Sequence, residues 1–219
     1  TKAPGRVHGG RAYLTDRDLL LMNRSEMRMT RLSDIALVPQ AALNSLNPVI
    51  RVERQIKDGI IDHAEDKKPT QEELDDRVQE LLRTVGLTSS VARMFPHELS
   101  GGMKQRVAMA IATSLSPKLI IADEPTSALD VVVQRQIMET LGQLQKGLSA
   151  SVILIGHDMG LVAQFADDAG QVEAIVLTLA VLDVIAGHAD HAMTLSFTPA
   201  RRVVSTRLPV SPSKRCTAP

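Results

Sequence analysis

Apolar residues recur at helical spacing in the middle of the chain. Every fourth residue from 52 to 60 is apolar, which gives one stripe along a predicted helix. A second helix is predicted to begin at Thr70, whose hydroxyl group is expected to form a capping box with Glu73, and to end before Gly86. Its buried face consists of Leu74, Val78, Leu81, Leu82 and Val85. The pattern therefore predicts two consecutive amphipathic helices in this region.

Short, mainly apolar runs flank this helical region and are typical of buried strands. The run 119–122 is apolar at every position, as expected for a strand in the middle of a parallel sheet. The predicted strands are 34–38, 119–122 and 151–155. Two further helices are predicted over 100–114 and 131–146, the latter ended by Gly147. Because a strand, a helix and a strand at this spacing form a right-handed crossover unit, the pattern indicates an α/β fold.

Composition excludes several classes of function. The formal net charge is zero and aromatic residues make up 2%, so neither electrostatics nor base stacking favours a nucleic-acid partner. The longest apolar stretch, 174–187, contains Asp183 and is shorter than the about 20 residues that span a bilayer. Contact with a membrane is therefore expected only through partner proteins. The tail 201–219 is basic and rich in proline and serine, which predicts poor order.

One motif is suited to holding phosphate. Residues 99–106 read Leu-Ser-Gly-Gly-Met-Lys-Gln-Arg. Ser100 can cap the helix that follows, while Gly101 and Gly102 allow an anion to approach the backbone at the positive end of that helix. Taken alone, Ser-Gly-Gly is more often a simple helix cap with a two-glycine turn. The complete string favours the phosphate-binding interpretation.

A second motif places two carboxylates at the end of a predicted strand. Asp123 and Glu124 follow the apolar run 119–122, at the edge of an α/β sheet where ligands bind. One acid can hold Mg²⁺ through its water shell, and its neighbour can orient or deprotonate an attacking water. The structural alternative is a strand that ends in two solvated acids. The sequence Pro-Thr-Ser-Ala-Leu-Asp that follows argues against that alternative.

In this order the two motifs resemble the signature, the Walker B segment and the D-loop of the ATPase subunits of ABC transporters. The resemblance implies that Asp123 serves Mg²⁺ and that Glu124 is the catalytic base. It also implies that the D-loop lies at a dimer interface and that the signature contacts ATP bound to the opposite subunit. The D-loop residues are Ser127, Ala128, Leu129 and Asp130, and the signature residues are Ser100, Gly101, Gly102 and Gln105.

Two single residues gain meaning only from this resemblance. His157 follows a predicted strand and Gly156, as the histidine of the family's H-loop does, and is expected to contact the γ-phosphate. Gln40 follows the predicted strand 34–38 and resembles the Q-loop glutamine, which contacts Mg²⁺ and couples to the membrane subunit. Without the resemblance, a lone histidine or glutamine is most often structural or simply exposed.

The resemblance implies an α/β, P-loop NTPase-like (RecA-like) ABC ATPase core with an inserted helical subdomain. We expect residues 1–48 to be a partial N-terminal part of the core and 49–98 the helical subdomain. Residues 99–168 are expected to complete the core, and 169–219 to form a divergent, partly disordered tail. The phosphate loop of the family, G-x-x-x-x-G-K-S/T, does not occur in the 219 residues. The chain is therefore predicted to be N-terminally truncated, a fragment or rearranged.

The functional prediction is an energy-coupling ATPase subunit of an ABC importer that uses ATP and Mg²⁺. The run Val-Pro-Gln-Ala-Ala-Leu-Asn-Ser-Leu-Asn-Pro (38–48) is similar to the dipeptide and oligopeptide branch, which includes nickel importers. Expected partners are transmembrane permease subunits and a second ATPase subunit, on the cytoplasmic side of the inner membrane. Without the phosphate loop, the chain is predicted to be inactive alone.

Two alternatives remain. In the first, the chain is a non-catalytic interaction fragment that complements the ATP site of an intact partner. In the second, it is a relative of chromosome-maintenance or DNA-repair ATPases. The short helices between residues 52 and 86 and the zero net charge disfavour the second alternative.

Overall fold

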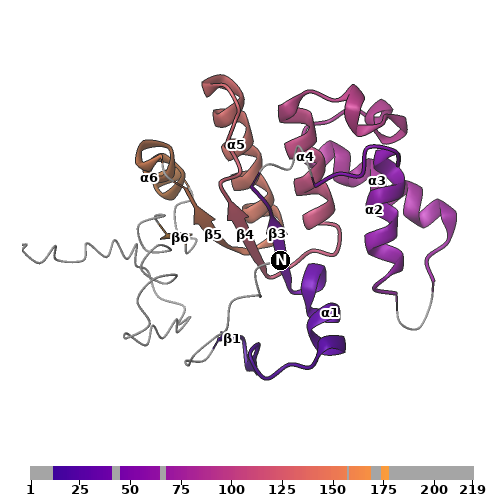
Figure 1. Cartoon of the computed structure of the whole chain (residues 1–219), viewed down its shortest axis with the longest axis horizontal. Coiled ribbons are helices and arrows are strands. Elements are labelled where there is room, and N and C mark those ends of the chain that lie inside the picture. Colours follow the sequence, from indigo (N-terminus) through magenta and orange to yellow (C-terminus); the bar gives the residue numbers. More distant parts are fainter. Residues whose placement is uncertain (1–11, 41–44, 65–67, 157, 169–173, 178–219) are drawn as a thin grey trace, which may run out of the picture.

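A parallel sheet forms the centre of the protein. The computed structural model describes residues 12–40, 45–64, 68–156, 158–168 and 174–177. Its four main strands lie side by side in the order β3-β4-β5-β6 (Figure 1). They are β3 (Ile35–Val38), β4 (Leu119–Asp123), β5 (Ser151–Ile155) and β6 (Ala174–Leu177). All three neighbouring pairs are parallel, which confirms the predicted α/β architecture.

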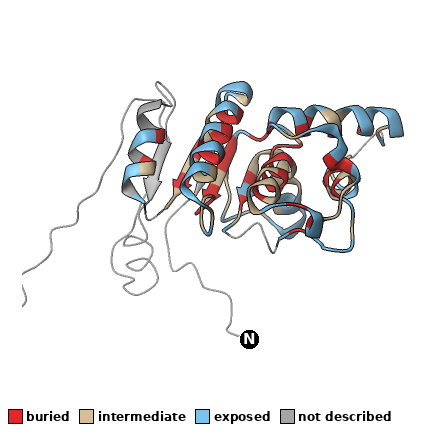
Figure 2. Ribbon diagram, turned by 90° about the horizontal axis from the view of Figure 1, so that it is seen from above, coloured by how far each residue is buried: buried red, intermediate tan, exposed pale blue. Residues whose placement is uncertain are grey.

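Three helices accompany these strands. They are α4 (Gly101–Ala112), α5 (Val131–Leu148) and α6 (Met159–Asp168). Buried residues gather on the strands and on the inner faces of the helices (Figure 2). Ile120 of β4, Val152 of β5 and Ile137 of α5 have no exposed surface. Burial of each large aliphatic side chain stabilises the fold by about 1.5–3 kcal/mol. This packing therefore fixes the positions of the strands and of their carboxyl-terminal ends.

A helical region lies on the side of the sheet away from α6 (Figure 1). It comprises α2 (Val52–Ile61), α3 (Gln71–Thr84) and the short 3-10 helices η2 (Ser89–Arg93) and η3 (Pro96–Glu98). The predicted capping box is present, since Thr70 Oγ1 accepts from Glu73 N at 3.2 Å and Glu73 Oε2 accepts from Thr70 N at 2.7 Å. Lys57 of α2 pairs with Asp75 of α3, and its hydrogen bond lowers the pKa of the Asp75 carboxyl.

The amino-terminal part contains short strands, which the weak alternation of residues 5–18 predicts, and a helix that the hydrophobic pattern did not predict. The strands β1 (Tyr13–Leu14) and β2 (Arg17–Asp18) form an antiparallel pair, and α1 (Arg24–Ser33) follows. A capping box of Asn23 and Glu26 begins α1. Its only buried residue is the polar Thr30, and its few apolar residues, Met27, Met29 and Leu32, are a weak pattern from which to predict a helix. Its end is kinked, with Leu32 in the left-handed region at φ 70°.

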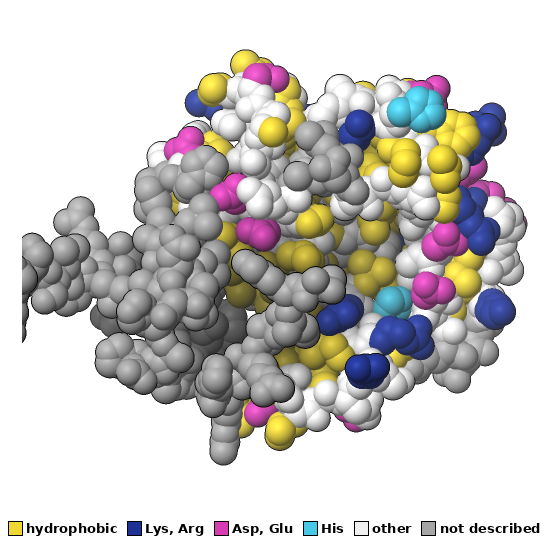
Figure 3. All heavy atoms as spheres, viewed as in Figure 1, with side chains coloured by type: hydrophobic (Ala, Val, Ile, Leu, Met, Phe, Trp, Pro, Cys, Tyr) yellow, Lys and Arg dark blue, Asp and Glu magenta, His cyan; other side chains and the backbone are white. Residues whose placement is uncertain are grey.

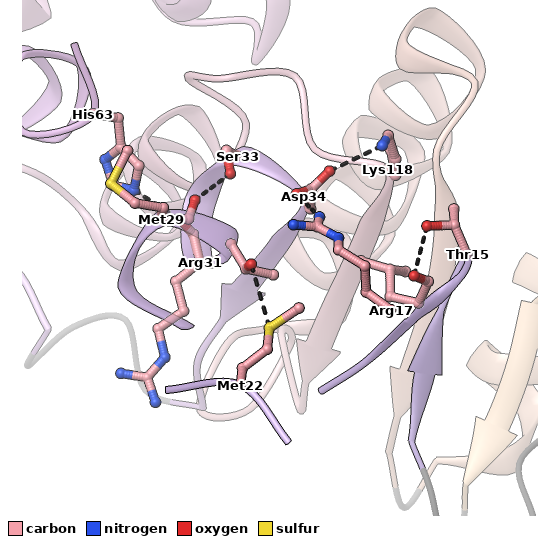
Figure 4. Close-up of polar contacts among 11 residues, drawn as sticks. Thr15, Arg17, Met22, Met29, Arg31, Ser33, Asp34, His63 and Lys118 are labelled. Atoms are coloured by element: carbon pink, nitrogen blue, oxygen red, sulfur yellow. Dashed lines mark hydrogen bonds and ion pairs between the residues drawn. The ribbon is translucent and has the colours of Figure 1, made fainter. Parts of the chain in front are cut away.

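Charged contacts hold this part against the opposite, amino-terminal edge of the sheet (Figure 4). Asp34 precedes β3, and its carboxylate pairs with Arg17 and with Lys118, whose Nζ lies 3.0 Å away. Both Lys118 N and Leu119 N donate to the carbonyl oxygen of Asp34 at 3.0 Å, which fixes the starts of β3 and β4 together. Basic side chains also gather on the surface where Figure 1 places α1 (Figure 3).

The structure corrects two of the predictions made from the hydrophobic pattern. The strand 34–38, predicted to be buried, has one open face, because Leu37 of β3 is 57% exposed. Helix α5 continues through Gly147 and ends at Leu148, and the C-cap residue Ser149 adopts a left-handed φ of 51°. Within the expected tail, residues 174–177 form the strand β6 in register with β5, and the predicted boundary of the tail at residue 169 stays a prediction. The predicted disorder of 201–219 lies outside the described residues. None of the described helices combines the length and apolar character that crossing a bilayer requires.

Candidate active site

The carboxyl edge of the sheet brings together two of the predicted site residues. Because β3 and β4 are parallel and Val38 pairs with Ala122, the residues that follow these strands meet at one edge. There Gln40 Nε2 donates a hydrogen bond of 2.6 Å to Glu124 Oε2. The two residues are 84 positions apart in sequence, and the hydrogen bond is therefore a product of the fold.

The backbone holds the Glu124 carboxylate in a fixed place. Glu124 N donates to the carbonyl oxygen of Ile155 at 2.9 Å, and the Glu124 carbonyl oxygen accepts from Ser127 N at 3.0 Å. The residue is 8% exposed and adopts a left-handed φ of 43°, which costs a residue with a side chain about 1–2 kcal/mol. Strain of this kind collects at functional sites and persists only where the surroundings impose it.

Asp123 and Gln40 fit a hydrated magnesium ion. Asp123 is the half-buried last residue of β4, directly before Glu124. Gln40 directs its amide nitrogen at Glu124, so its amide oxygen is the atom that suits a cation. Among the described residues, no three His, Cys, Asp or Glu side chains gather as a metal cluster. Mg²⁺ keeps most of its waters and binds one or two protein groups together with phosphate oxygens, and the Asp123 carboxylate and the Gln40 amide oxygen are protein groups of the kind that would hold it.

The turn after Glu124 leads into α5. Ala128 has a left-handed φ of 62°. Leu129 is half-buried against the core, and Ser127 is half-buried as well. Asp130 caps α5, since its Oδ1 accepts from Val133 N at 3.0 Å. Together with Gly156 and the start of α6, residues 124–128 line a cleft of about 180 Å³. The predicted D-loop residues therefore form an ordered and partly exposed turn beside Glu124.

The predicted signature residues begin α4. Ser100 is exposed and caps the helix by accepting from Met103 N at 3.3 Å. The first backbone amides of a helix have no acceptor inside it and point outward along the axis, as an anion site requires. Gln105 has a different position, because it is 4% exposed and its Nε2 has no partner among the described residues. Its side chain lies inside the fold and not on a surface that another subunit could reach.

The remaining predicted residue, His157, lies outside the described residues. Its neighbour Asp158 begins α6, since its Oδ1 accepts from Gly160 N at 3.0 Å and from Leu161 N at 3.1 Å. The sequence analysis missed this role, although an Asp just before an apolar helical run is a cap signal. In the sequence, Gly156 and His157 separate the end of β5 from Asp158.

Comparison with known proteins shows the family to which this chain belongs. A model of the family described as "ABC transporter" matches residues 6–127, more than half of the chain. The chain belongs to the ABC transporter family. It is similar to the "Oligopeptide transport ATP-binding protein OppD" of Bacillus subtilis (strain 168), with 42% identity over 75% of this chain and 46% of that protein. The "Dipeptide transport ATP-binding protein DppD" of Haemophilus influenzae is 43% identical over 75% of this chain and 49% of that protein. The chain thus spans about half the length of these relatives.

Solved ABC structures share the fold. The dimeric structure of MJ0796, described as a bacterial ABC transporter cassette, superposes with a TM-score of 0.62 at 29% identity, covering 76% of this chain and 68% of that one. A post-hydrolysis state of the same cassette, bound to ADP and Pi, gives the same TM-score. The expected ABC ATPase fold, α/β with a parallel sheet, is confirmed. The roles of the individual site residues, the domain boundaries and the truncation stay predictions.

Proposed function

We propose that this chain is the ATP-binding, energy-coupling part of an ABC importer for peptides. The hydrogen bond between Gln40 and Glu124 is the observation that carries the proposal, because it joins the Q-loop and Walker B residues at one edge of the sheet. The similarity to oligopeptide and dipeptide transport ATP-binding proteins supports peptides as the cargo. The partners would be transmembrane permease subunits, which would hold the chain at the cytoplasmic face of the membrane.

Each site residue has a proposed role that rests on its position in the fold or, for His157, on the resemblance to the family alone. Glu124, buried and hydrogen-bonded, orients or deprotonates the attacking water. Asp123 and Gln40 hold Mg²⁺, which when bound neutralises charge on the phosphates. His157 contacts the γ-phosphate. Ser100, Gly101 and Gly102 offer the amino end of α4 to ATP on the second ATPase subunit, and the turn 127–130 lies at the interface with that subunit.

We further propose that the 219-residue polypeptide hydrolyses little ATP by itself. Phosphoryl transfer depends on a cradle for the β- and γ-phosphates, and no G-x-x-x-x-G-K-S/T sequence occurs in this polypeptide. The second candidate function is a non-catalytic fragment that supplies its signature to the ATP site of an intact partner. The exposed Ser100 at the start of α4 favours this candidate.

A phosphate-release assay on the purified polypeptide tests the first claim. We expect no magnesium-dependent turnover above background, with or without the substitution Glu124→Gln. Clear turnover that Glu124→Gln abolishes would show that the polypeptide is a competent ATPase. That outcome would overturn the claim of inactivity and would establish Glu124 as the catalytic base.

A complementation assay tests the contribution in trans. The partner is an intact relative such as OppD, with its own signature serine replaced by arginine so that it supplies a phosphate loop but no signature. We expect the wild-type polypeptide to restore ATPase activity to this partner and Ser100→Arg to abolish the restoration. Ser89→Arg, at an exposed serine that begins η2, is the matched control. If no activity returns with the wild-type polypeptide, its signature does not act in trans.

A further inference from the structure

The second glycine of the signature faces another helix of the same chain. A Cβ atom built on Gly102 lies 2.6 Å from Val133 Cγ1 in the first turn of α5. Carbon atoms pack at about 3.5–4.0 Å, so a side chain at position 102 would force α4 and α5 apart. Val133 is β-branched, and its single preferred helical rotamer gives it little room to turn away.

Val133 also contacts Asp130, the last residue of the D-loop and the N-cap of α5. Its backbone N–H donates to Asp130 Oδ1 at 3.0 Å, while its side chain packs against Gly102. One residue therefore contacts the end of the D-loop through its backbone and the start of the signature helix through its side chain. One turn further along both helices, Arg106 Nη2 donates to Gln136 Oε1 at 3.1 Å and maintains the same approach of α4 and α5.

This contact does not compete with a phosphate site. In the first helical turn the backbone N–H groups point along the axis, whereas the Cα–Cβ bonds project sideways. The missing side chain of Gly102 therefore allows α5 to approach, and its amide remains directed out of the helix. Gly102 has a packing function in its own subunit that is separate from any contact of its amide with a nucleotide.

We infer that Val133 is a positioning residue, which sets the amino end of the signature helix relative to the D-loop through its contact with Gly102. The consequence for catalysis rests on the function proposed above. If α4 is displaced by the width of a methyl group, its amides miss the phosphate of the opposite site. A misplacement of about 1 Å can lower a rate by about a hundredfold.

A double-mutant cycle of Gly102→Ala and Val133→Ala tests the inference. In thermal unfolding of the 219-residue polypeptide, we expect Gly102→Ala to lower the Tm by several degrees and the double variant to recover most of the loss. Gly147→Ala is the matched control, because a Cβ at this helical position meets nothing within 4 Å. If Gly102→Ala does not fold, the yield of soluble protein is compared among the same four proteins instead, and the double variant should be recovered in higher yield than Gly102→Ala. Equal losses in the single and the double variant overturn the inference.

The complementation assay distinguishes a positioning role from a purely structural one, because it measures kcat and KM per folded molecule. Per folded molecule, Gly102→Ala should lower the restored kcat about ten- to hundredfold with a smaller change in KM, and added Val133→Ala should bring kcat back to within about threefold. If Ser100→Arg abolishes activity but Val133→Ala gives no rescue, the positioning role is wrong and the proposed function stands. If the wild-type chain restores nothing, the function in trans fails, and the unfolding cycle alone decides the contact.

Discussion

Replacement of Asp34 by Asn should destabilise the protein at neutral pH and have little effect in acid. The Asp34 side chain is 17% exposed and pairs with Arg17 and Lys118, which are 49% and 60% exposed. A buried charge-assisted pair contributes about 1.5–3 kcal/mol, but exposed partners reduce an ion pair to about 0–1 kcal/mol. With two such partners on a mostly buried carboxylate, we expect a loss of about 1–2 kcal/mol.

The pH dependence follows from the pKa of Asp34. Burial raises the pKa of this carboxyl, but hydrogen bonds and charge from Lys118 and Arg17 outweigh burial and leave it below the ordinary value of 3.8. A folded-state pKa below the unfolded value stabilises the fold above the unfolded pKa, and this contribution is lost as pH falls through the folded pKa. The difference in free energy of unfolding between wild type and Asp34→Asn should therefore be largest at pH 7 and become smaller below about pH 4.

Urea unfolding at several pH values measures this difference. Asp58→Asn is the matched control, because the Arg54–Asp58 pair on α2 has side chains that are 65% and 43% exposed, and its loss should cost no more than about 0.5 kcal/mol. The argument fails if Asp34→Asn and Asp58→Asn cost the same at pH 7. It also fails if the cost of Asp34→Asn does not change between pH 7 and pH 3.

Two further substitutions test the helix assignments. Gly147→Ala should raise the free energy of unfolding by about 0.5 kcal/mol, because Gly147 is inside α5 with open space where a Cβ would lie, and chemical denaturation would measure the gain. A loss of stability would instead place the end of α5 before Gly147. Thr70→Ala should cost about 1 kcal/mol in the same assay, since it removes the cap of α3, whereas Thr88→Ala, before η2 and without a cap hydrogen bond, should cost less. Equal costs would contradict the capping box.

The sequence was sufficient to predict the carboxyl edge of the sheet. Apolar runs predict parallel strands, Gln40 and Glu124 each follow such a run, and parallel strands end at one edge of a sheet. Their hydrogen bond follows from that topology. The left-handed backbone of Glu124 could not be predicted, because it depends on the hydrogen bond from its N–H to Ile155, on a strand that begins 27 residues later.

Contacts between helices could not be predicted from the sequence for a similar reason. The pattern predicted both α4 and α5, but which residues meet depends on how the two helices cross. Gly102 could therefore be interpreted only as a glycine that an anion approaches, and its contact with Val133 was missed. Leu37 is the converse case. An apolar run predicted a buried strand, yet one face of β3 is open in the described part of the chain.

The two edges of the sheet should respond differently to mutation. At the amino edge, Asp34 and Lys118 join strand starts through ion pairs and backbone hydrogen bonds, so a change there should alter stability. At the carboxyl edge, Glu124 is a buried carboxylate on a left-handed backbone, and an amide of the same size removes charge without leaving a cavity. Glu124→Gln should therefore leave the free energy of unfolding unchanged or slightly higher, because groups placed for chemistry are commonly held at a cost in stability. A large loss of stability in Glu124→Gln would assign Glu124 to the scaffold and remove the structural basis for its role as a base.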